Sequence, residues 1–392
     1  MQNKNILISG AGIAGPTLAF WLSRYGFNPT VVEHAPKPRE GGYMIDFWGV
    51  GYDVAEKMGI LDPMKKVSYK IQKLIFLGDR GEKKGALDLS KSIQLLDGRM
   101  LSLLRSDLAN ILYNSTKQNV RYLFDDTISN LEQTEEGVKV VFKKRGAETF
   151  DLVVGADGLH SNVRSQVFRN SNTFERFFGY YVASSTFDNF LGKDFTAKYS
   201  MYSMPNKQVG VYSLRENKIS IFLIFKYLEK IGDPKKVLKE VFKEGKWACR
   251  HILEKLDEAP DFYFDAVSQI VLPKWSQGRV VLLGDAAFCP SLLSGQGAAL
   301  AMAGAYVLAG ELFQAGGDYS RAFASYEQIF KPFVEKKQLT AEYFIHSFVP
   351  STRFNIWKRN MGSRLMGIPL FSRLYWKRFL IDAIRLKDYS SL

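Results

Sequence analysis

Three turns rich in glycine or aspartate carry the residue types that could bind a nucleotide. The first covers residues 10–15 (GAGIAG) and lies between an apolar run and a segment with helical periodicity. Gly10 would allow a tight strand-to-helix turn, Gly12 would let the backbone approach a pyrophosphate, and Gly15 would let the helix pack closely on the strand. Free N–H groups at the start of the helix, near Ala14, favour a bound phosphate. This spacing predicts a dinucleotide site.

An acidic side chain stands where the second strand of this unit should end. Glu33 closes the apolar segment 28–33, about twenty residues beyond Gly10. A carboxylate at this position binds the ribose hydroxyls of an adenosine and disfavours a 2′-phosphate. A glycine turn with a purely structural role is the alternative.

Two further turns place an aspartate after an apolar strand. Asp157 lies in residues 155–158 (GADG), and Arg164 follows in the next helical segment. Taken alone, this could be any turn after a strand. Asp285 lies in residues 283–287 (LGDAA). It would stand at the C-terminal end of its strand, where open α/β sheets bind their ligands.

A glycine pair follows the third turn and opens a long helix of small residues. The pair is Gly295 and Gly297, and Ala298 comes directly after it. The first N–H groups of a helix have no partner within the helix, so they are available to an anion. A helix cap with a turn is the alternative interpretation, but three such turns in one chain favour a common ligand.

The elements that must position these turns form a doubly wound pattern. Apolar runs and helical periodicity predict a βαβ unit over residues 4–33, further strands at 120–123 and 138–142, and buried strands at 150–155 and 279–283. Between them, residues 174–225 change to alternating, aromatic-rich strands that are typical of an antiparallel sheet. We therefore expect an α/β fold with a discontinuous nucleotide-binding domain (1–170 and 268–340), a sheet domain (171–267) and a C-terminal helical segment (341–392).

Composition excludes several classes of protein. The chain has 392 residues, only two cysteines, four scattered histidines and a net charge of +13. No disulfide framework or metal-ligand spacing is present, so we expect a cytoplasmic protein without a metal. Nine Lys/Arg against two Asp fall in residues 351–392. No nucleic-acid-binding module accompanies this charge, so we expect no nucleic-acid partner and treat the charge as a local feature of the C-terminal segment. A monomer is the expected oligomeric state.

Two segments raise the question of a membrane. Residues 286–310 carry no charge, but Pro290 and the glycines interrupt them, which favours a buried helix over a membrane span. The C-terminal segment mixes aromatic and basic residues, and Pro369 is predicted to divide it into two helices. A helix pair packed across the domains is the favoured interpretation. A substrate lid and an interfacial membrane anchor are the alternatives, and we expect no membrane contact.

The three turns, in this order, resemble those of the single-component flavoprotein aromatic hydroxylases, the class A FAD monooxygenases. The resemblance covers residues 4–340. The segments FYFDAVSQI (262–270), GDAAFCPSLLSGQG (284–297) and GAYVLAGEL (304–312) are further similar to the tetracycline-inactivating monooxygenases, the tetracycline destructases. The expected fold is then a Rossmann-like FAD-binding domain interrupted by an antiparallel substrate-binding sheet.

The resemblance implies roles for individual residues. The first turn and Glu33 would bind the ADP half of FAD, and Arg105, in LLRSDLANIL, would contact the flavin cofactor. Asp285 would bind the ribityl chain, Asp46 would be another flavin contact, and Arg39 would contact the phosphate of the nicotinamide cofactor. The sequence departs from the family at two places, because Ala299 and Gly304 stand where Asn and Asp are frequent.

The resemblance also implies a reaction. NAD(P)H would reduce FAD, O₂ would add at C4a, and the flavin hydroperoxide would hydroxylate an aromatic or polyketide ring, with tetracyclines as the first candidates. The N–H groups near Gly297 and Ala298 would stabilise negative charge on the reduced flavin. We expect no acid–base triad. Six aromatic residues would face the flavin and stack on a flat substrate: Phe177, Phe178, Tyr180, Tyr181, Phe222 and Phe225.

Other functions on the same fold remain open. A flavin reductase or a halogenase is one alternative, although the sequence lacks the WxWxIP element of halogenases. A flavin-binding protein without catalytic activity is the alternative from another class.

Overall fold

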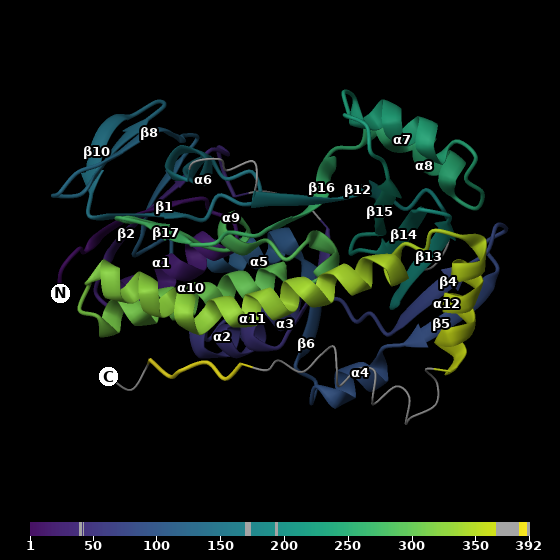
Figure 1. Ribbon diagram of the computed structural model, residues 1–392. Coiled ribbons are helices and arrows are strands. Elements are labelled where there is room, and N and C mark those ends of the chain that lie inside the picture. Colours follow the sequence, from purple (N-terminus) through teal and green to yellow (C-terminus); the bar gives the residue numbers. More distant parts are fainter. Residues whose placement is uncertain (39–40, 42, 169–173, 193–194, 366–383, 390–392) are drawn as a thin grey trace.

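The computed structural model describes residues 1–38, 41, 43–168, 174–192, 195–365 and 384–389. Figure 1 shows an elongated molecule with two sheets at its two ends and long helices between and beneath them. The N-terminus and the described residues 384–389 lie at the same end of the molecule as the first sheet.

The first sheet has six strands in the order β17-β18-β11-β1-β2-β7. The five strands β18, β11, β1, β2 and β7 run parallel, and the short β17 pairs antiparallel at the edge. Their bounds are β1 Asn5–Ser9, β2 Asn28–Glu33, β7 Arg121–Phe124, β11 Leu152–Gly155, β17 Ser276–Gln277 and β18 Val280–Leu282. The predicted βαβ unit is confirmed, because helix α1 (Ala14–Arg24) joins β1 to the adjacent parallel β2.

Helices cover one side of this sheet, and a small antiparallel sheet lies on the other side (Figure 1). Helix α1 packs directly on β1 and β2, and the other helices on this side are α2 (Val50–Met58), α3 (Leu61–Val67), α5 (Arg105–Asn114), α10 (Gly297–Gln314) and α11 (Tyr319–Phe348). The small sheet contains β8 (Ile128–Gln133), β9 (Val138–Phe142) and β10 (Gly146–Phe150). Helix α6 (Asn162–Val167) lies beside it.

Helix α10 is the uncharged segment that raised the question of a membrane span. Among the described residues it is the one helix long and apolar enough to cross a membrane, and 78% of that window is buried inside the protein. It packs against α1, α2 and α11. This burial is what the sequence predicted for a core helix.

The second sheet has seven strands in the order β16-β12-β15-β14-β13-β4-β5. The antiparallel strands expected between residues 174 and 225 are β12 (Glu175–Asp188), β13 (Lys198–Met204), β14 (Lys207–Ser213) and β15 (Lys218–Lys226), and β16 (Tyr263–Ile270) pairs with β12 at the edge. Strands β4 (Lys73–Leu77) and β5 (Lys83–Asp88) join it through parallel pairing of β4 with β13. Residues 73–88 therefore belong to this sheet, although the sequence placed them in the first domain.

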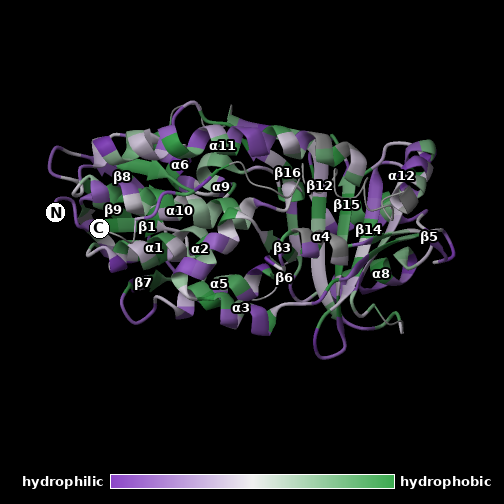
Figure 2. Ribbon diagram, turned by 90° about the horizontal axis from the view of Figure 1, so that it is seen from below, coloured by the Kyte–Doolittle hydropathy of each residue, from purple (hydrophilic) through white to green (hydrophobic). Residues whose placement is uncertain are grey.

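Helices α7 (Pro234–Phe242) and α8 (Cys249–Lys255) cover the outer face of the second sheet. Strand β15 is buried along its whole interior, from Ile219 to Phe225, because both faces of the sheet are covered. Figure 2 colours the ribbon by hydropathy, and hydrophobic residues recur along the strands of both sheets.

A two-stranded ribbon links the two halves. It consists of β3 (Met44–Trp48) and β6 (Met100–Leu104), and the backbone N–H of Met44 donates to the hydroxyl of Tyr212 on β14 at 2.7 Å. The remaining helices are α4 (Ser90–Leu95), α9 (Asp285–Phe288) and α12 (Arg353–Leu365), with short 3-10 turns at Leu256–Glu258 and Leu292–Ser294. In the C-terminal segment the helical structure is interrupted between Phe348, where α11 ends, and Arg353, where α12 begins. The interruption expected at Pro369 lies outside the described residues.

Candidate flavin-binding site

The three turns predicted from the sequence meet at the C-terminal ends of β1, β11 and β18. Gly10 has φ +108°, and a Cβ on it would lie 2.4 Å from the carbonyl oxygen of Ala156 in the second turn. A Cβ on Gly284, in the third turn, would lie 3.0 Å from the Cβ of Ala14. A Cβ on Gly15 would lie 1.9 Å from the carbonyl oxygen of Gly10. At Gly10 and Gly15 a side chain is excluded because backbone packs against backbone, and at Gly284 it is disfavoured by the Ala14 side chain and by the positive φ of the backbone (+64°).

Arg164 ties the second turn to the third. Its guanidinium donates to the carbonyl oxygens of Ala286 (2.9 Å) and Leu159 (2.6 Å), and the residue is 5% exposed. The sequence drew attention to Arg164 but assigned it no site role. Its position just after an Asp-Gly turn was the available signal.

Glu33 stands at the end of β2, beside the first turn. One carboxylate oxygen accepts from the backbone N–H of Ala11 at 2.8 Å, and the other accepts from that of Ala35 at 3.0 Å. The imidazole of His34 lies 2.8 Å from the same carboxylate. Glu33 therefore has a fixed orientation next to the glycine turn.

Arg105 begins helix α5 and reaches the same place from another direction. Its backbone N–H donates to the carbonyl oxygen of Tyr43 at 3.1 Å, and its guanidinium lies 3.6 Å from where a Cβ on Gly12 would stand. Within the described part of the chain, this guanidinium makes no hydrogen bond. Burial opposes its charge, but the nearby Tyr43 hydroxyl and Asp285 carboxyl outweigh burial and raise the pKa of Arg105.

Asp285 supplies the negative charge that accompanies Arg105 in this cluster. It begins the short helix α9 after Gly284, which has φ +64°. Burial raises the pKa of Asp285, while the Arg105 charge and a hydrogen bond with Cys289 oppose the rise. One carboxylate oxygen lies 3.6 Å from where a Cβ on Gly297 would stand, so Asp285 faces the start of α10.

The N-terminus of α10 offers free backbone donors. Gly295 precedes it in the left-handed conformation (φ +65°), and Gln296 provides no side-chain cap. The backbone N–H of Leu300 donates to the carbonyl oxygen of Gln296 at 2.9 Å. The N–H groups of Gly297 and Ala298 lie ahead of this bond, where an α-helix has no internal acceptor for them.

Asp157 caps a helix. Its carboxylate accepts from the Ser161 hydroxyl and from the backbone N–H groups of Asn162 (2.9 Å) and Val163 (3.1 Å) at the start of α6. Burial raises the pKa of Asp157, and these bonds oppose the rise. The carboxylate thus shapes the second turn, and a contact with the cofactor stays a prediction.

Asp46 lies on β3, opposite Ser102 of β6, whose hydroxyl donates to it. Asp46 is exposed to solvent, but protein surrounds its carboxyl group closely enough to reduce its hydration. This loss of hydration raises the pKa of Asp46, and the hydrogen bond from Ser102 opposes the rise. Arg39 lies outside the described residues. Of the predicted site residues, the three turns, Glu33, Arg105 and the start of α10 are therefore brought together, with Asp46 on the neighbouring ribbon.

An aromatic wall faces this cluster, formed by rings of the second sheet together with Tyr43, the residue before β3. The ring of Tyr43 lies 5.3 Å from that of Tyr263 and 6.5 Å from that of Phe222, and Phe178 and Tyr180 belong to the same cluster.

Half of the aromatic residues expected on this wall point the other way. Tyr181 stacks on Phe225 and Phe264, and Phe225 contacts Phe242 of α7 on the outer face. Phe177 packs against Tyr181 and not against the wall. The prediction was wrong for Phe177, Tyr181 and Phe225, because successive side chains of a strand point to opposite faces of its sheet.

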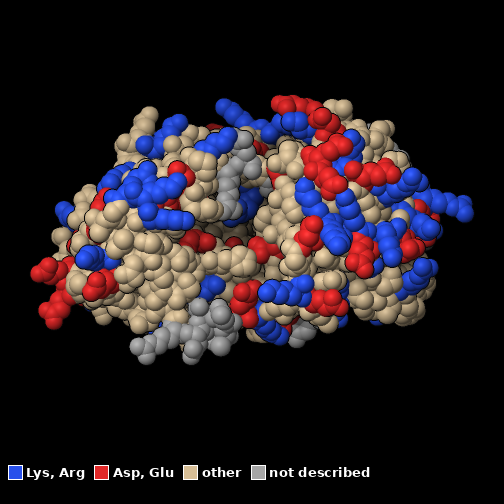
Figure 3. All heavy atoms as spheres, turned by 90° about the horizontal axis from the view of Figure 1, so that it is seen from above, with Lys and Arg blue, Asp and Glu red and all other residues tan. Residues whose placement is uncertain are grey.

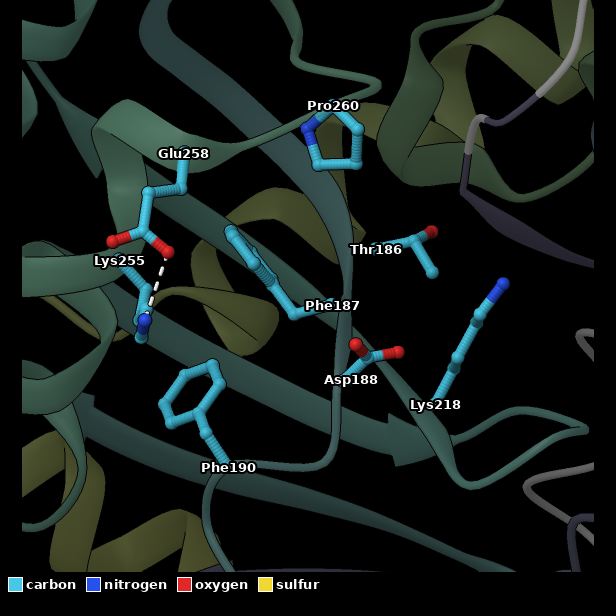
Figure 4. Close-up of a pocket in the computed structure, with 8 residues that line it drawn as sticks. All are labelled: Thr186, Phe187, Asp188, Phe190, Lys218, Lys255, Glu258 and Pro260. Carbon is cyan, nitrogen blue, oxygen red and sulfur yellow. Dashed lines mark hydrogen bonds and ion pairs between the residues drawn. The ribbon is translucent and has the colours of Figure 1, made fainter.

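The molecule is hollowed between its two halves, as Figure 3 shows, with basic and acidic side chains at the bottom of the hollow. A separate cavity of about 380 Å³ lies where β12 ends and β15 begins, next to the end of α8 (Figure 4). Phe187, Phe190 and Pro260 line it, and the ion pair of Lys255 with Glu258 (2.8 Å) stands at its rim. None of the three turns contributes to it.

The residues present fit a dinucleotide. The glycine turn leaves room for a pyrophosphate, Arg105 has unused donors beside it, and α10 directs free N–H groups into the same space. An anion fits here because the cluster combines a helix N-terminus with the partly buried guanidinium of Arg105.

Comparison with known proteins agrees with this geometry. The sequence profile of a family described as an FAD binding domain matches residues 3–337. A flavin-dependent monooxygenase of Legionella longbeachae is 34% identical over 359 residues, which cover 89% of this chain and 90% of the relative. An uncharacterised protein of Mycobacterium tuberculosis is 41% identical over 346 residues, 86% of this chain and 92% of its own length.

The crystal structure of tetracycline destructase Tet(55) superposes with a TM-score of 0.85 at 34% identity and covers 99% of both chains. The profile spans most of the chain, and the matched relatives share the whole fold. The chain therefore belongs to the FAD-binding-domain family, as a flavin-dependent monooxygenase of the class A hydroxylase type.

Proposed function

We propose that this monooxygenase uses NAD(P)H and O₂ to hydroxylate a flat ring compound of aromatic or polyketide type. The observation that carries the proposal is the hollow between the two halves, where the flavin-binding cluster faces the aromatic wall of Tyr43, Phe222 and Tyr263. Aromatic side chains bind flat rings by stacking and edge contacts.

When bound, FAD would supply the redox chemistry, by accepting a hydride from NAD(P)H and passing one atom of O₂ to the substrate. The protein would supply position and electrostatics. Arg105 would bind the cofactor's pyrophosphate or flavin oxygens, and Asp285 would accept from ribityl hydroxyls. The N–H groups of Gly297 and Ala298 would stabilise negative charge on the reduced ring.

Enclosure is the second contribution of the protein. The wall of Tyr43, Phe222 and Tyr263 would exclude water from the reacting atoms, which strengthens electrostatic interactions and limits loss of oxygen as H₂O₂. Tetracyclines are the first candidate substrates, because Tet(55) and Tet(51) resemble this chain over nearly its whole length.

The test is turnover of the FAD-loaded protein with a panel of tetracyclines, other polyketides and simple phenols. We expect at least one compound to accelerate NADPH or NADH oxidation and to yield a product heavier by one oxygen atom in mass spectrometry. Oxidation of NAD(P)H with stoichiometric H₂O₂ and no oxygenated product would favour a reductase. A protein that binds FAD but never oxidises NAD(P)H would contradict the proposal.

A further inference from the structure

Helix α12 (Arg353–Leu365) has its polarity reversed relative to an ordinary surface helix. A surface helix normally buries its apolar stripe and exposes its charged face. In α12, the side that packs on the second sheet carries Arg359, Asn360 and Ser363, and Asn360 and Ser363 are 8% and 5% exposed. The side that faces solvent carries Phe354, Trp357 and Met361.

Polar contacts fix the inner side of α12. The guanidinium of Arg359 donates to the Ser203 hydroxyl (3.0 Å), to Gln208 Oε1 (3.2 Å) and to the carbonyl oxygen of Phe348 (3.2 Å), and it lies 4.3 Å from the Phe76 ring centroid. On strand β5, a Cβ on Gly85 would lie 2.6 Å from the Ser363 hydroxyl oxygen, so the helix and the sheet are in close contact. The outer side is therefore presented by a fixed helix.

The outer side is apolar and basic. Phe354 is 66% exposed, Trp357 is 58% exposed and Met361 is 40% exposed. The rings of Phe354 and Trp357 stack at 5.8 Å, and the exposed Arg353 and Lys358 flank them. Tryptophan is highly buried on average, so an exposed pair of stacked large rings calls for a partner.

The charge of this side decides which partner fits. Residues 351–365 carry four Lys/Arg and no Asp or Glu. A second copy of the chain would place Arg353 and Lys358 against the same positive charges, which is unfavourable. The following residues 366–383 carry three Lys/Arg and one Asp, so they offer no complementary charge. The fitting surface is apolar and negatively charged.

We propose that the outer face of α12, formed by Arg353, Phe354, Trp357, Lys358 and Met361, binds the surface of a membrane that contains anionic lipid. Aromatic rings insert at the level of the lipid headgroups, and basic side chains bind the anionic lipids beside them. Helix α12 lies at the end of the molecule remote from the first sheet (Figure 1), so it could contact a membrane while the first domain stays clear of it. The sequence alone led us to expect no membrane contact.

Sedimentation of the FAD-loaded, full-length protein with sucrose-filled vesicles tests the proposal. We expect binding to vesicles of phosphatidylcholine with about one third phosphatidylglycerol, weak binding to pure phosphatidylcholine, and weaker binding at high salt because salt screens the basic residues. The double variant Phe354→Ser with Trp357→Ser should lower the partition coefficient at least tenfold. The matched control is Leu228→Ser, because Leu228 is 74% exposed elsewhere on the sheet domain and should leave binding unchanged.

A second measurement keeps the proposal testable if the double variant fails to fold. Brominated lipids in the anionic vesicles should quench tryptophan fluorescence of the wild type, and Trp357→Phe should remove most of that quenching. Absence of binding, equal binding by the double variant, or quenching that persists in Trp357→Phe would overturn the proposal. Light scattering that shows a wild-type dimer and a monomeric double variant would also overturn the proposal, because the outer face of α12 would then bind a second copy of the chain. These measurements do not depend on which substrate the enzyme hydroxylates.

Discussion

At the scale of single residues, the site is defined by charges that the protein leaves incompletely paired. Arg105 and Asp285 lie partly buried in the same cluster, and each shifts the pKa of the other through space. Glu33, in contrast, is oriented by two backbone N–H groups. A buried charge with unused hydrogen-bonding capacity is costly unless a ligand completes it.

Replacing Arg105 should therefore weaken FAD binding. Loss of a charge-assisted hydrogen bond costs about 1.5–3 kcal/mol, so we expect Arg105→Ala to raise the dissociation constant of FAD by about tenfold or more. The dissociation constant of Arg105→Lys should lie between those of the wild type and Arg105→Ala, because an ammonium keeps the charge but not the planar donors. Titration of the apoprotein followed by flavin fluorescence measures this. Arg250→Ala is the control, because the Arg250 side chain is 85% exposed on α8; an Arg105→Ala variant with unchanged affinity would show that the guanidinium does not contact FAD.

His160 should make stability depend on pH. Its imidazole lies 2.9 Å from an Asp265 carboxylate oxygen, and this hydrogen bond raises its pKa. The raised pKa adds stability that is fully present below the unfolded pKa of about 6.5 and is lost as pH rises through the folded value. The imidazole is 66% exposed, so solvent screening limits the contribution to less than about 1 kcal/mol.

Thermal unfolding of wild type and His160→Gln checks this expectation. The wild type should have the higher midpoint at pH 5.5, and the difference should vanish by pH 8.5. Asp265→Asn should remove the same difference. A difference that is equal at both pH values would show that the pair contributes by packing alone.

At the scale of elements, Gly15 lets α1 approach the backbone of the first turn, and the glycines of α10 let aromatic rings pack against that helix. On α10, a Cβ on Gly304 would lie 3.0 Å from the Phe288 ring, and one on Gly310 would lie 2.4 Å from the Tyr389 ring. The alanine- and glycine-rich composition that resembles a membrane span is therefore explained by close packing inside the protein. The same packing directs the N-terminus of α10 at the cofactor site.

Gly15→Ala tests the packing of α1 under β1. A Cβ there would overlap the carbonyl oxygen of Gly10, so the helix or the turn must move. Such overpacking costs about 1–3 kcal/mol and should displace the N–H groups that bind the pyrophosphate. We expect a protein that purifies with less FAD, measured as absorbance at 450 nm per chain. Gly362→Ala, in open space on α12, is the control and should retain FAD; full FAD content in Gly15→Ala would count against the predicted pyrophosphate position.

At the scale of the whole molecule, the cofactor site joins segments from distant parts of the chain. The turns after β1, β11 and β18, helix α5 and the start of α10 all contribute. The ribbon of β3 and β6 then links this site to the second sheet through the bond between Met44 and Tyr212. A ligand bound by so many segments binds the folded state alone.

Removal of FAD should therefore lower the thermal unfolding midpoint of the entire protein. A ligand that binds only the native state adds about 2.7 kcal/mol of stability at one hundred times its dissociation constant. We expect the midpoint of the apoprotein to rise steadily with added FAD in differential scanning fluorimetry, and riboflavin, which lacks the ADP half, to have little effect. An apoprotein midpoint equal to that of the holoprotein would contradict a cofactor site shared by these segments.

The sequence by itself determined the local elements and the three turns. The spacing of Gly10, Gly12 and Gly15 and the aspartates after apolar strands were readable because each depends on neighbours within a few residues. The apolar periodicity likewise predicted the parallel strands of the first sheet and the buried helix α10.

Only the tertiary structure decided which distant segments meet and which way each side chain points. Strands β4 and β13 pair across more than a hundred residues of chain, which no local pattern records. The sequence likewise did not determine which face of the second sheet is turned toward the site. In the structure Phe222 faces the site and Phe225 faces helix α7. The reversed polarity of α12 belongs to the same class. Periodicity shows that a helix has two faces, but its packing partner determines which face is buried.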